Sequence, residues 1–266
     1  MAAAPRSALI LLSVFLLAFG MRAGMMAVTG TNGMTADSVE FSEAAKEIAK
    51  GHGFSLVQLA DGKWSPMMTS EPGYALFLAF LFLIGIPLGK AVLWVQVILG
   101  SLLAPVIYSY VERKRDPKTA ALAALVYAVD PIAAGPCLFI LRELFTMSVI
   151  LAAVCSFDIR GKIGTVIKGI LLAAAGLSFS LLVLWPIWIF FVDRRFSQKA
   201  GRCVMVGSVL IAYLFIGSWM VRNAVVSQGN YMLRRHLTAL LPYYTARYDF
   251  PWLPDPEEPG LKRIVE

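Results

Sequence analysis

Residues 91–110 read AVLWVQVILGSLLAPVIYSY, twenty consecutive positions without a single charged side chain. About 20 mostly apolar residues in a helix are enough to cross the hydrocarbon core of a bilayer. The next stretch, residues 112–118, reads ERKRDPK and is strongly basic. Lys and Arg gather in cytoplasmic loops of membrane proteins. The apolar segment and the basic segment after it together predict a transmembrane helix that ends in the cytoplasm.

The composition of the whole chain agrees with this interpretation. Of its 266 residues, 58% are hydrophobic and only 15% are charged, and the mean hydropathy is +0.70. A soluble fold of this size could not bury so much apolar surface in one core. Disordered, coiled-coil, disulfide-rich secreted and soluble nucleic-acid-binding proteins are excluded on the same grounds. We expect membrane lipids as the surroundings and no nucleic-acid partner, and attribute the net charge of +7 to cytoplasmic loops.

Further apolar runs lie on both sides of this stretch. They cover residues 7–28, 73–88, 119–134, 137–157, 164–192 and 203–221. The run 164–192 is too long for one straight span and contains Ser178 and Ser180, so it predicts two short helices that meet near Ser178. A cleaved signal peptide is the alternative interpretation of the first run. Cys137, Cys155 and Cys203 all lie within such runs, which indicates small buried hydrophobes with no disulfide framework and no metal site of four ligands.

The charges between the runs predict the topology. The basic segments 112–118, 160–162 and 194–202 belong in the cytoplasm with Arg6, whereas residues 29–72 carry six acids against three bases and belong outside. Both conditions hold only if residues 74–85 dip into the membrane without crossing it. The expectation is an all-α polytopic bundle of about seven transmembrane helices, with the N-terminus inside and the C-terminus outside. A full crossing by 74–88, giving eight, is the alternative.

Two regions follow from this topology. Residues 1–222 form the transmembrane module, whose first outer loop, about 29–72, carries short juxtamembrane helices. Residues 223–266 form an outer tail rich in aromatic residues and proline.

One segment of the first outer loop has a helical pattern. Phe41, Ala44, Ala45 and Ile48 recur at steps of three and four residues and form one apolar face. Asp37 lies at the start of this helix, where a carboxylate serves as an N-cap. Gly51-His52-Gly53 ends the helix, and His52 is expected to be exposed rather than a ligand.

Several motifs, taken in order, resemble the GT-C glycosyltransferases, nearest to the bacterial aminoarabinose transferases and protein O-mannosyltransferase-like proteins. The first group is Asp37 with Phe41 and Ala45, Gly51-His52-Gly53-Phe54, and Glu71-Pro72-Gly73-Tyr74 entering an apolar helix. The second is Arg22, Pro131, Glu143 and Trp219-Met220-Val221-Arg222-Asn223. The resemblance covers about residues 8–235.

This resemblance implies transfer of a sugar from a polyprenyl-phosphate donor to an acceptor outside the bacterial inner (plasma) membrane. It assigns Asp37 as the acceptor-side base and Glu143 as a second catalytic acid. The residues expected to bind substrate or lipid phosphate are Arg22, Glu40, Glu71, Tyr74, Arg142, Trp219, Arg222 and Asn223, with Arg234-Arg235-His236 as further outer bases. The chemistry agrees, because carboxylates stabilise a cationic sugar ring and cations hold the leaving phosphate. Two acids leave the need for a divalent metal open.

Other interpretations stay open. The first is a non-catalytic membrane subunit that binds a polyprenyl lipid or a partner enzyme. Two features favour it: the family's basic residue before a proline is replaced by Ser178-Phe179-Ser180, and the chain is shorter than family members. A transporter is disfavoured, because no internal repeat is found. Glu143 could form a simple ion pair with Arg142, and Trp219 with Arg222 could be an interfacial anchor.

The helix 74–85 has its own expected role. It would form one wall of a lipid groove against the span 91–110. Its residues Leu76, Phe77, Ala79, Phe80 and Leu83 would then face acyl chains or the first span.

Overall fold

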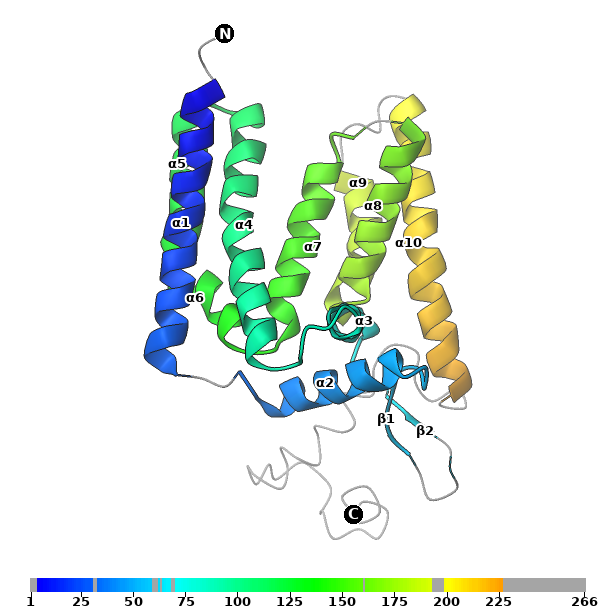
Figure 1. Cartoon of the computed structure of the whole chain (residues 1–266). Helices are drawn as coiled ribbons and strands as arrows, with labels where there is room; N and C mark the ends of the chain where they lie inside the picture. Colours follow the sequence, from blue (N-terminus) through cyan, green and yellow to red (C-terminus); the bar gives the residue numbers. More distant parts are fainter. Residues whose placement is uncertain are drawn as a thin grey trace, which may run out of the picture.

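The computed structural model describes residues 4–30, 33–58, 62, 64–67, 70–159, 161–192 and 199–226, and these are mostly helical (Figure 1). The α-helices are α1 (Ala4–Thr29), α2 (Ala36–Ala49), α3 (Pro72–Leu83), α4 (Lys90–Lys114), α5 (Pro117–Val129), α6 (Pro131–Ala134), α7 (Arg142–Ser156), α8 (Gly161–Gly176), α9 (Trp185–Val192) and α10 (Lys199–Val226). Two 3-10 helices, η1 (Gly135–Leu138) and η2 (Ser180–Leu184), and one antiparallel hairpin of β1 (Ser55–Gln58) and β2 (Trp64–Pro66) complete the described elements.

Three helices are long and apolar enough to cross a membrane. They are Ala8–Thr29, Lys90–Lys114 and Cys203–Val226, and α5 with α6 and η1 makes a fourth if the pair, bent by 61°, is one span. Their outward side chains are apolar, with Leu9 66% and Leu214 70% exposed. Such exposed apolar surface is stable only in lipid, so the chain is a membrane protein.

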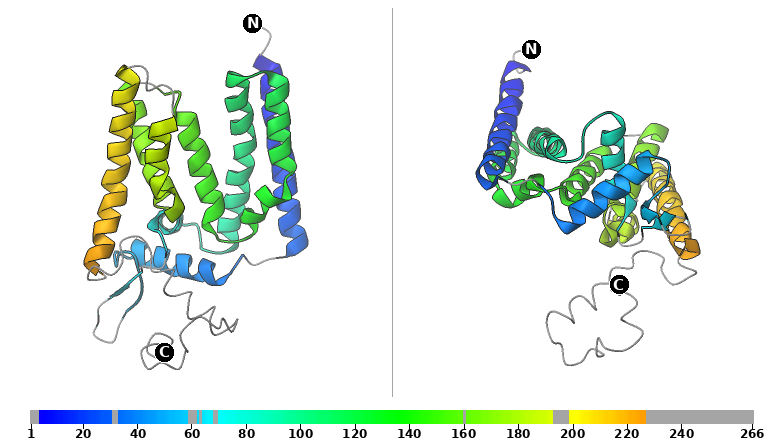
Figure 2. Two further views of the ribbon diagram at one scale, coloured as in Figure 1. Left: turned by 180° about the vertical axis from the view of Figure 1, so that it is seen from behind. Right: turned by 60° about the horizontal axis from the view of Figure 1, so that its bottom comes forward.

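The two ends of the bundle differ in character. The start of α1, the α4–α5 turn, the α7–α8 turn and the start of α10 lie at one end, whereas α2, α3 and the hairpin lie at the other (Figures 1 and 2). Helix α4 joins the two ends: it begins at Lys90 and has Arg113 and Lys114 in its last turn. Its 25 residues correspond to about 37 Å. Helix α3 has only 12 residues, about 18 Å, which is short of a bilayer core.

Small residues allow the long helices to pack closely. Ala18 of α1, Ala104 of α4 and Ala124 of α5 are fully buried in one cluster. On the other side of the bundle, a Cβ added to Gly169 of α8 would lie 2.6 Å from the side chain of Ile211 of α10. Close contact through small residues is the usual way for membrane helices to associate.

Helices α2 and α3 form a second layer against the end of the bundle. The predicted apolar face of α2 is confirmed, since Phe41, Ala44 and Ala45 are buried against Tyr74 of α3 and Leu93 of α4. The N-cap prediction is wrong. Thr35, not Asp37, caps the helix, and its hydroxyl accepts the backbone N–H of Ser38. Both residue types can cap a helix, and the chain enters α2 two residues earlier than expected.

Several other boundaries differ from the sequence prediction. The run 119–134 is broken after Val129, where Asp130 accepts the N–H of Ile132 and Pro131 starts a new turn. The run 137–157 begins as a 3-10 turn, and its helix starts only at Arg142. The break near Ser178 is confirmed between α8 and η2. The hairpin was not predicted.

Candidate functional site

The carbonyl of Gly33 ties together the starts of α2 and α7. It accepts the backbone N–H of Ile140 at 2.9 Å and the hydroxyl of Ser38 at 3.2 Å. A carbonyl oxygen has two lone pairs, so it can hold both donors. Gly33 has a positive φ of 75°, and a Cβ there would lie 2.6 Å from the Leu93 side chain. Only glycine suits this position.

The two carboxylates assigned to catalysis lie beside this junction. Asp37 and Glu143 are each in the first turn of their helix, α2 and α7 respectively, so both are near a positive helix end. Both side chains are exposed. In the part of the chain that the structure describes, neither forms a hydrogen bond or ion pair. Glu143 lies within electrostatic reach of the Tyr74 phenol. The two helices joined at Gly33 therefore each carry an exposed carboxylate in the first turn.

Arg142 and Glu71 form a buried ion pair across three elements. Arg142 Nη1 donates to Glu71 Oε2, and their side chains are 11% and 3% exposed. Glu71 Oε1 accepts the backbone N–H of Ser180 at 3.1 Å, and the guanidinium lies 4.7 Å from the Phe179 ring centre. The expected alternative, an ion pair of Arg142 with Glu143, is wrong, because Glu71 is the partner. The pair fixes the starts of α3, α7 and η2 relative to one another.

Arg222 near the end of α10 holds the base of the hairpin. Its Nη1 donates to Met67 O and its Nη2 to Phe54 O, both at 3.0 Å. Nη1 also donates to Asn223 Oδ1 at 2.9 Å, and Asn223 is 1% exposed. The guanidinium lies 4.8 Å from the Trp219 ring centre. Arg222 therefore donates to oxygens of the protein the N–H groups that a lipid phosphate would need.

Arg22 is enclosed within the bundle. It is fully buried on α1, and its Nη1 donates to Ala18 O at 3.1 Å and to Ala128 O at 3.4 Å. Ala128 lies in the last turn of α5, where carbonyls lack helical partners. The guanidinium also lies 4.7 Å from the Tyr127 ring centre. Its Nε and Nη2 have no hydrogen-bond partner among the described residues. Arg22 thus stabilises the broken end of α5.

The remaining predicted binding residues are distributed unevenly. Tyr74 is fully buried, and its hydroxyl donates to Gln96, so it does not reach a substrate. Glu40 is half-buried one turn after Asp37 on α2. Trp219 packs edge-on against Phe54 at 5.2 Å. Arg234-Arg235-His236 and residues 227–266 of the predicted tail lie outside the described residues.

An apolar pocket of about 390 Å³ lies between α3, α7, α8 and α10. It is lined by Gly73, Leu76, Phe77 and Phe80 of α3, by Phe145 of α7, by Ile170, Ala173 and Ala174 of α8 with Leu177, and by Phe215 of α10. The predicted second wall of the groove is wrong, because no residue of 91–110 lines this pocket. Ala79 is buried in the cluster that α3 forms with α2 and α4. Leu76, Phe80 and Leu83 are exposed as expected.

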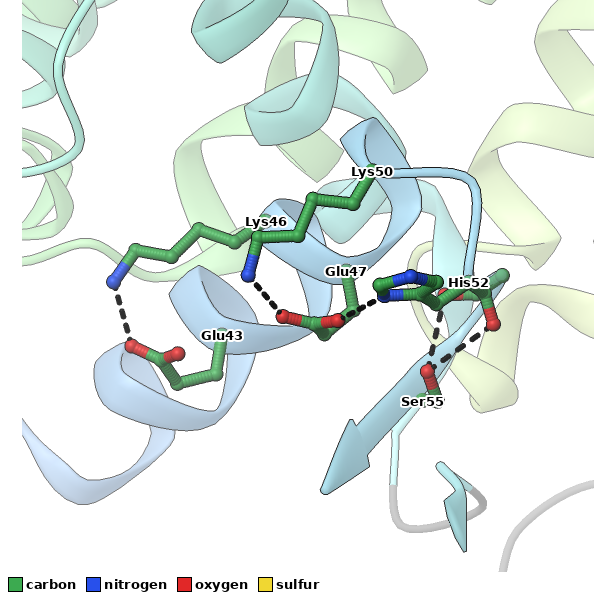
Figure 3. Close-up of polar contacts among 7 residues, drawn as sticks. Glu43, Lys46, Glu47, Lys50, His52 and Ser55 are labelled. Carbon is green, nitrogen blue, oxygen red and sulfur yellow. Dashed lines mark hydrogen bonds and ion pairs between the residues drawn. The ribbon is translucent and has the colours of Figure 1, made fainter. Parts of the chain in front are cut away.

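A separate polar cluster joins the end of α2 to the hairpin (Figure 3). Glu47 is 6% exposed, and its carboxylate lies 2.7 Å from Lys50 Nζ and 2.6 Å from His52 Nδ1. The His52 ring stacks on Trp64 at 4.1 Å. His52 is exposed, as predicted, but has these partners. The hydrogen bond from Lys50, followed by that of His52, lowers the pKa of Glu47 below 4.5. The cluster stabilises the hairpin.

Sequence reasoning missed two residues that shape the site, Gly33 and Gln96. Gln96 had a detectable signal, since an amide within an apolar span is rarely exposed to lipid. Gly33 had none beyond its residue type. No group of three or more His, Cys, Asp or Glu side chains that could hold a metal occurs among the described residues.

Comparisons with known proteins add no relative. No protein-family model, curated protein or solved structure matches this chain.

Proposed function

We propose that the chain is a GT-C-type membrane glycosyltransferase that moves a sugar from a polyprenyl-phosphate donor to an acceptor. The observation that carries the proposal is the junction at Gly33, which joins the starts of α2 and α7, the two helices whose first turns carry the exposed carboxylates of Asp37 and Glu143. Two of the motifs that resemble the family, those of Asp37 and Glu143, come from distant parts of the sequence and lie on the two helices joined at this junction.

The two carboxylates suit the chemistry of sugar transfer. The transition state has a positively charged sugar ring, which nearby carboxylates stabilise. One carboxylate must also accept the proton of the attacking hydroxyl. Asp37 is proposed as this base and Glu143 as the second acid. A divalent ion could bind the same carboxylates together with the donor phosphate.

The donor lipid would lie in the apolar pocket. Arg142 lies one turn before Phe145, which lines the pocket, so its guanidinium is close to where a lipid phosphate would end. A guanidinium has five N–H donors, and Glu71 takes one of them. Arg22, Arg142 and Arg222 were all expected to bind phosphate, and Arg142 is the one to which we assign that role. A tail that stays in lipid avoids about 0.8 kcal/mol for each CH₂ exposed to water.

The proposed topology has seven crossings. These are α1, α4, α5 with α6, α7, α8, η2 with α9, and α10. Successive segments start at alternate ends of the bundle in Figures 1 and 2, which supports this number. Arg113, Lys114 and Lys118 lie at the end where α1 begins, and the positive-inside rule assigns that end to the cytoplasm of a bacterial inner membrane.

The site proposal is tested with Asp37→Asn. Purified protein is assayed for sugar turnover with a panel of polyprenyl-phosphate sugars, and the variant is expected to lose about 10²–10⁴-fold in rate, as on removal of a general base. Thr35 caps α2, so folding is expected to be unchanged. Glu43→Gln is the matched control, because Glu43 is an exposed carboxylate of the same helix that pairs with Lys46. Retention of more than a tenth of the rate in Asp37→Asn would exclude this role.

The alternative proposal is a non-catalytic membrane subunit that binds a polyprenyl lipid or a partner enzyme. The observation in its favour is that Arg22 and Arg222 donate to the protein itself. Such a subunit would bind polyprenyl phosphate in the pocket without turning over any sugar of the panel.

A further inference from the structure

A buried amide in the apolar stretch 91–110 connects three elements. Gln96 of α4 is 1% exposed. Its Oε1 accepts the Tyr74 hydroxyl of α3 at 2.5 Å. Its Nε2 donates to Phe139 O at 2.7 Å and to Pro136 O at 3.3 Å. Both of its N–H groups and its carbonyl oxygen are thus used inside the bundle.

The two carbonyls bound by Gln96 belong to the segment that leads into α7. Phe139 has an extended backbone, with φ −133° and ψ 151°, at the end of η1. Its carbonyl oxygen accepts the backbone N–H of Leu141 at 2.9 Å, and its second lone pair accepts the Gln96 amide. The next residue, Ile140, donates to Gly33. Glu143 follows three residues later, in the first turn of α7.

We propose that Gln96 is a positioning residue for Glu143. Its amide holds residues 136–139 from the bundle side, while Gly33 holds Ile140 from the α2 side, and the start of α7 is fixed between them. This inference rests on the proposed role of Glu143 in sugar transfer. Gln96 does not touch the substrate, because it is enclosed by α3, α4 and η1.

The same amide connects Glu143 to the lipid pocket. Tyr74, which donates to Gln96, is followed in α3 by Leu76 and Phe77, which line the pocket. Phe145 lines it from α7, two residues after Glu143, and stacks on Phe77 at 4.9 Å. The pocket wall and the carboxylate are therefore held by one network. Loss of the amide removes two hydrogen bonds from the segment before Glu143 but only one from α3, so we expect it to disturb the position of Glu143 more than the apolar pocket.

The test is Gln96→Met, which keeps the length of the side chain and removes both N–H donors. Two measurements are made: hydrogen exchange of the Ile140 and Leu141 amides, and kcat and KM for the lipid donor. Exchange is expected to accelerate about tenfold, because two hydrogen bonds to the segment are lost. We expect kcat to fall about 10–100-fold, as for a misplaced catalytic group, while KM stays within about twofold because the pocket remains.

Ser101→Ala is the matched control. Ser101 is also fully buried on α4, but its hydroxyl donates only within the helix, to Val97 O at 2.6 Å. Its exchange and kinetics are expected to match those of the parent protein. Unchanged exchange in Gln96→Met overturns the hydrogen-bond argument, and faster exchange with an unchanged kcat overturns the positioning role. If the parent protein transfers no sugar, the proposed function fails, and the exchange measurement alone decides whether Gln96 holds the segment.

Discussion

Replacing Arg142 with Met tests whether its buried pair with Glu71 holds the site together. The substitution leaves the Glu71 carboxylate 3% exposed and without its cation. Removing one partner of a buried ion pair costs about 3–5 kcal/mol, because an uncompensated charge remains. The N–H of Ser180 still donates to Glu71 at 3.1 Å, so we expect a loss near 3 kcal/mol in the free energy of unfolding.

Two further variants separate the cost of the orphaned charge from the value of the pair. Glu71→Gln keeps an acceptor for Ser180 and for Arg142, and is expected to lose about 1–2 kcal/mol. The double variant Glu71→Gln with Arg142→Met removes both charges, and is expected to lose less than Arg142→Met alone. Unfolding in detergent micelles at one pH and salt concentration gives all three values as a double-mutant cycle.

The same variants distinguish a structural arginine from one that binds only phosphate. If Arg142 served only a lipid phosphate, Arg142→Met would weaken binding of polyprenyl phosphate and leave unfolding unchanged. A stability loss below about 1 kcal/mol, the range of a surface ion pair, would refute the argument from burial. So would a double variant whose loss equals the sum of the single losses.

Three other variants test the neighbouring contacts. Gly33→Ala adds a Cβ 2.6 Å from Leu93 at a φ of +75°, so we expect the free energy of unfolding to fall by about 2 kcal/mol or more. Gly51→Ala places its Cβ in open space at a φ of +86°, so it should lose only the contribution of backbone strain. Arg222→Met removes the donors to Phe54 and Met67, and is expected to speed exchange of the Met67 amide about tenfold, whereas Arg113→Met at the opposite end should not. The pKa of Glu47 is lower in the folded protein than in the unfolded chain. The ionised carboxylate therefore stabilises the fold above the unfolded pKa, and this stabilisation is lost as the pH falls through the folded pKa. Glu47→Gln should be less stable than the parent at pH 7, and the difference in thermal unfolding should shrink below about pH 4.

The sequence predicted those features that depend on local hydropathy. The first and last runs became α1 and α10, the apolar face of α2 was correct, and the break near Ser178 is present. The same reasoning was wrong wherever two local signals competed. Thr35 and Asp37 are both good capping residues, and the structure uses the first. The hairpin is short, with strands of four and three residues, so period-two alternation had little length in which to appear.

The direction in which α3 faces could not be predicted from its own sequence. PGYALFLAFLFL is apolar on all sides, and periodicity cannot assign a buried face to such a helix. The choice is made by residues outside it: Gln96 of α4 accepts the Tyr74 hydroxyl, and Leu177 accepts the backbone N–H of Gly73 at 2.7 Å. With these contacts, one face of α3 lies in the cluster with α2 and α4, and the other lines the pocket beside α7, α8 and α10.

Arg22 and Arg222 have a shared role that can be recognised only once the interruptions of the helices and strands are known. An interruption of a helix or strand near the membrane leaves carbonyl lone pairs that can accept a further donor where water is scarce. Arg22 donates to the broken end of α5, and Arg222 donates to both sides of the hairpin base. The sequence contains both the arginines and the breaks, but they are separated by 106 residues for Arg22 and Ala128 and by 168 for Arg222 and Phe54. An arginine in an apolar chain should therefore be tested first as a donor to such a carbonyl. By this criterion Arg142, whose partner is the Glu71 carboxylate rather than a carbonyl, is the arginine of the three that keeps the phosphate role in the proposed function.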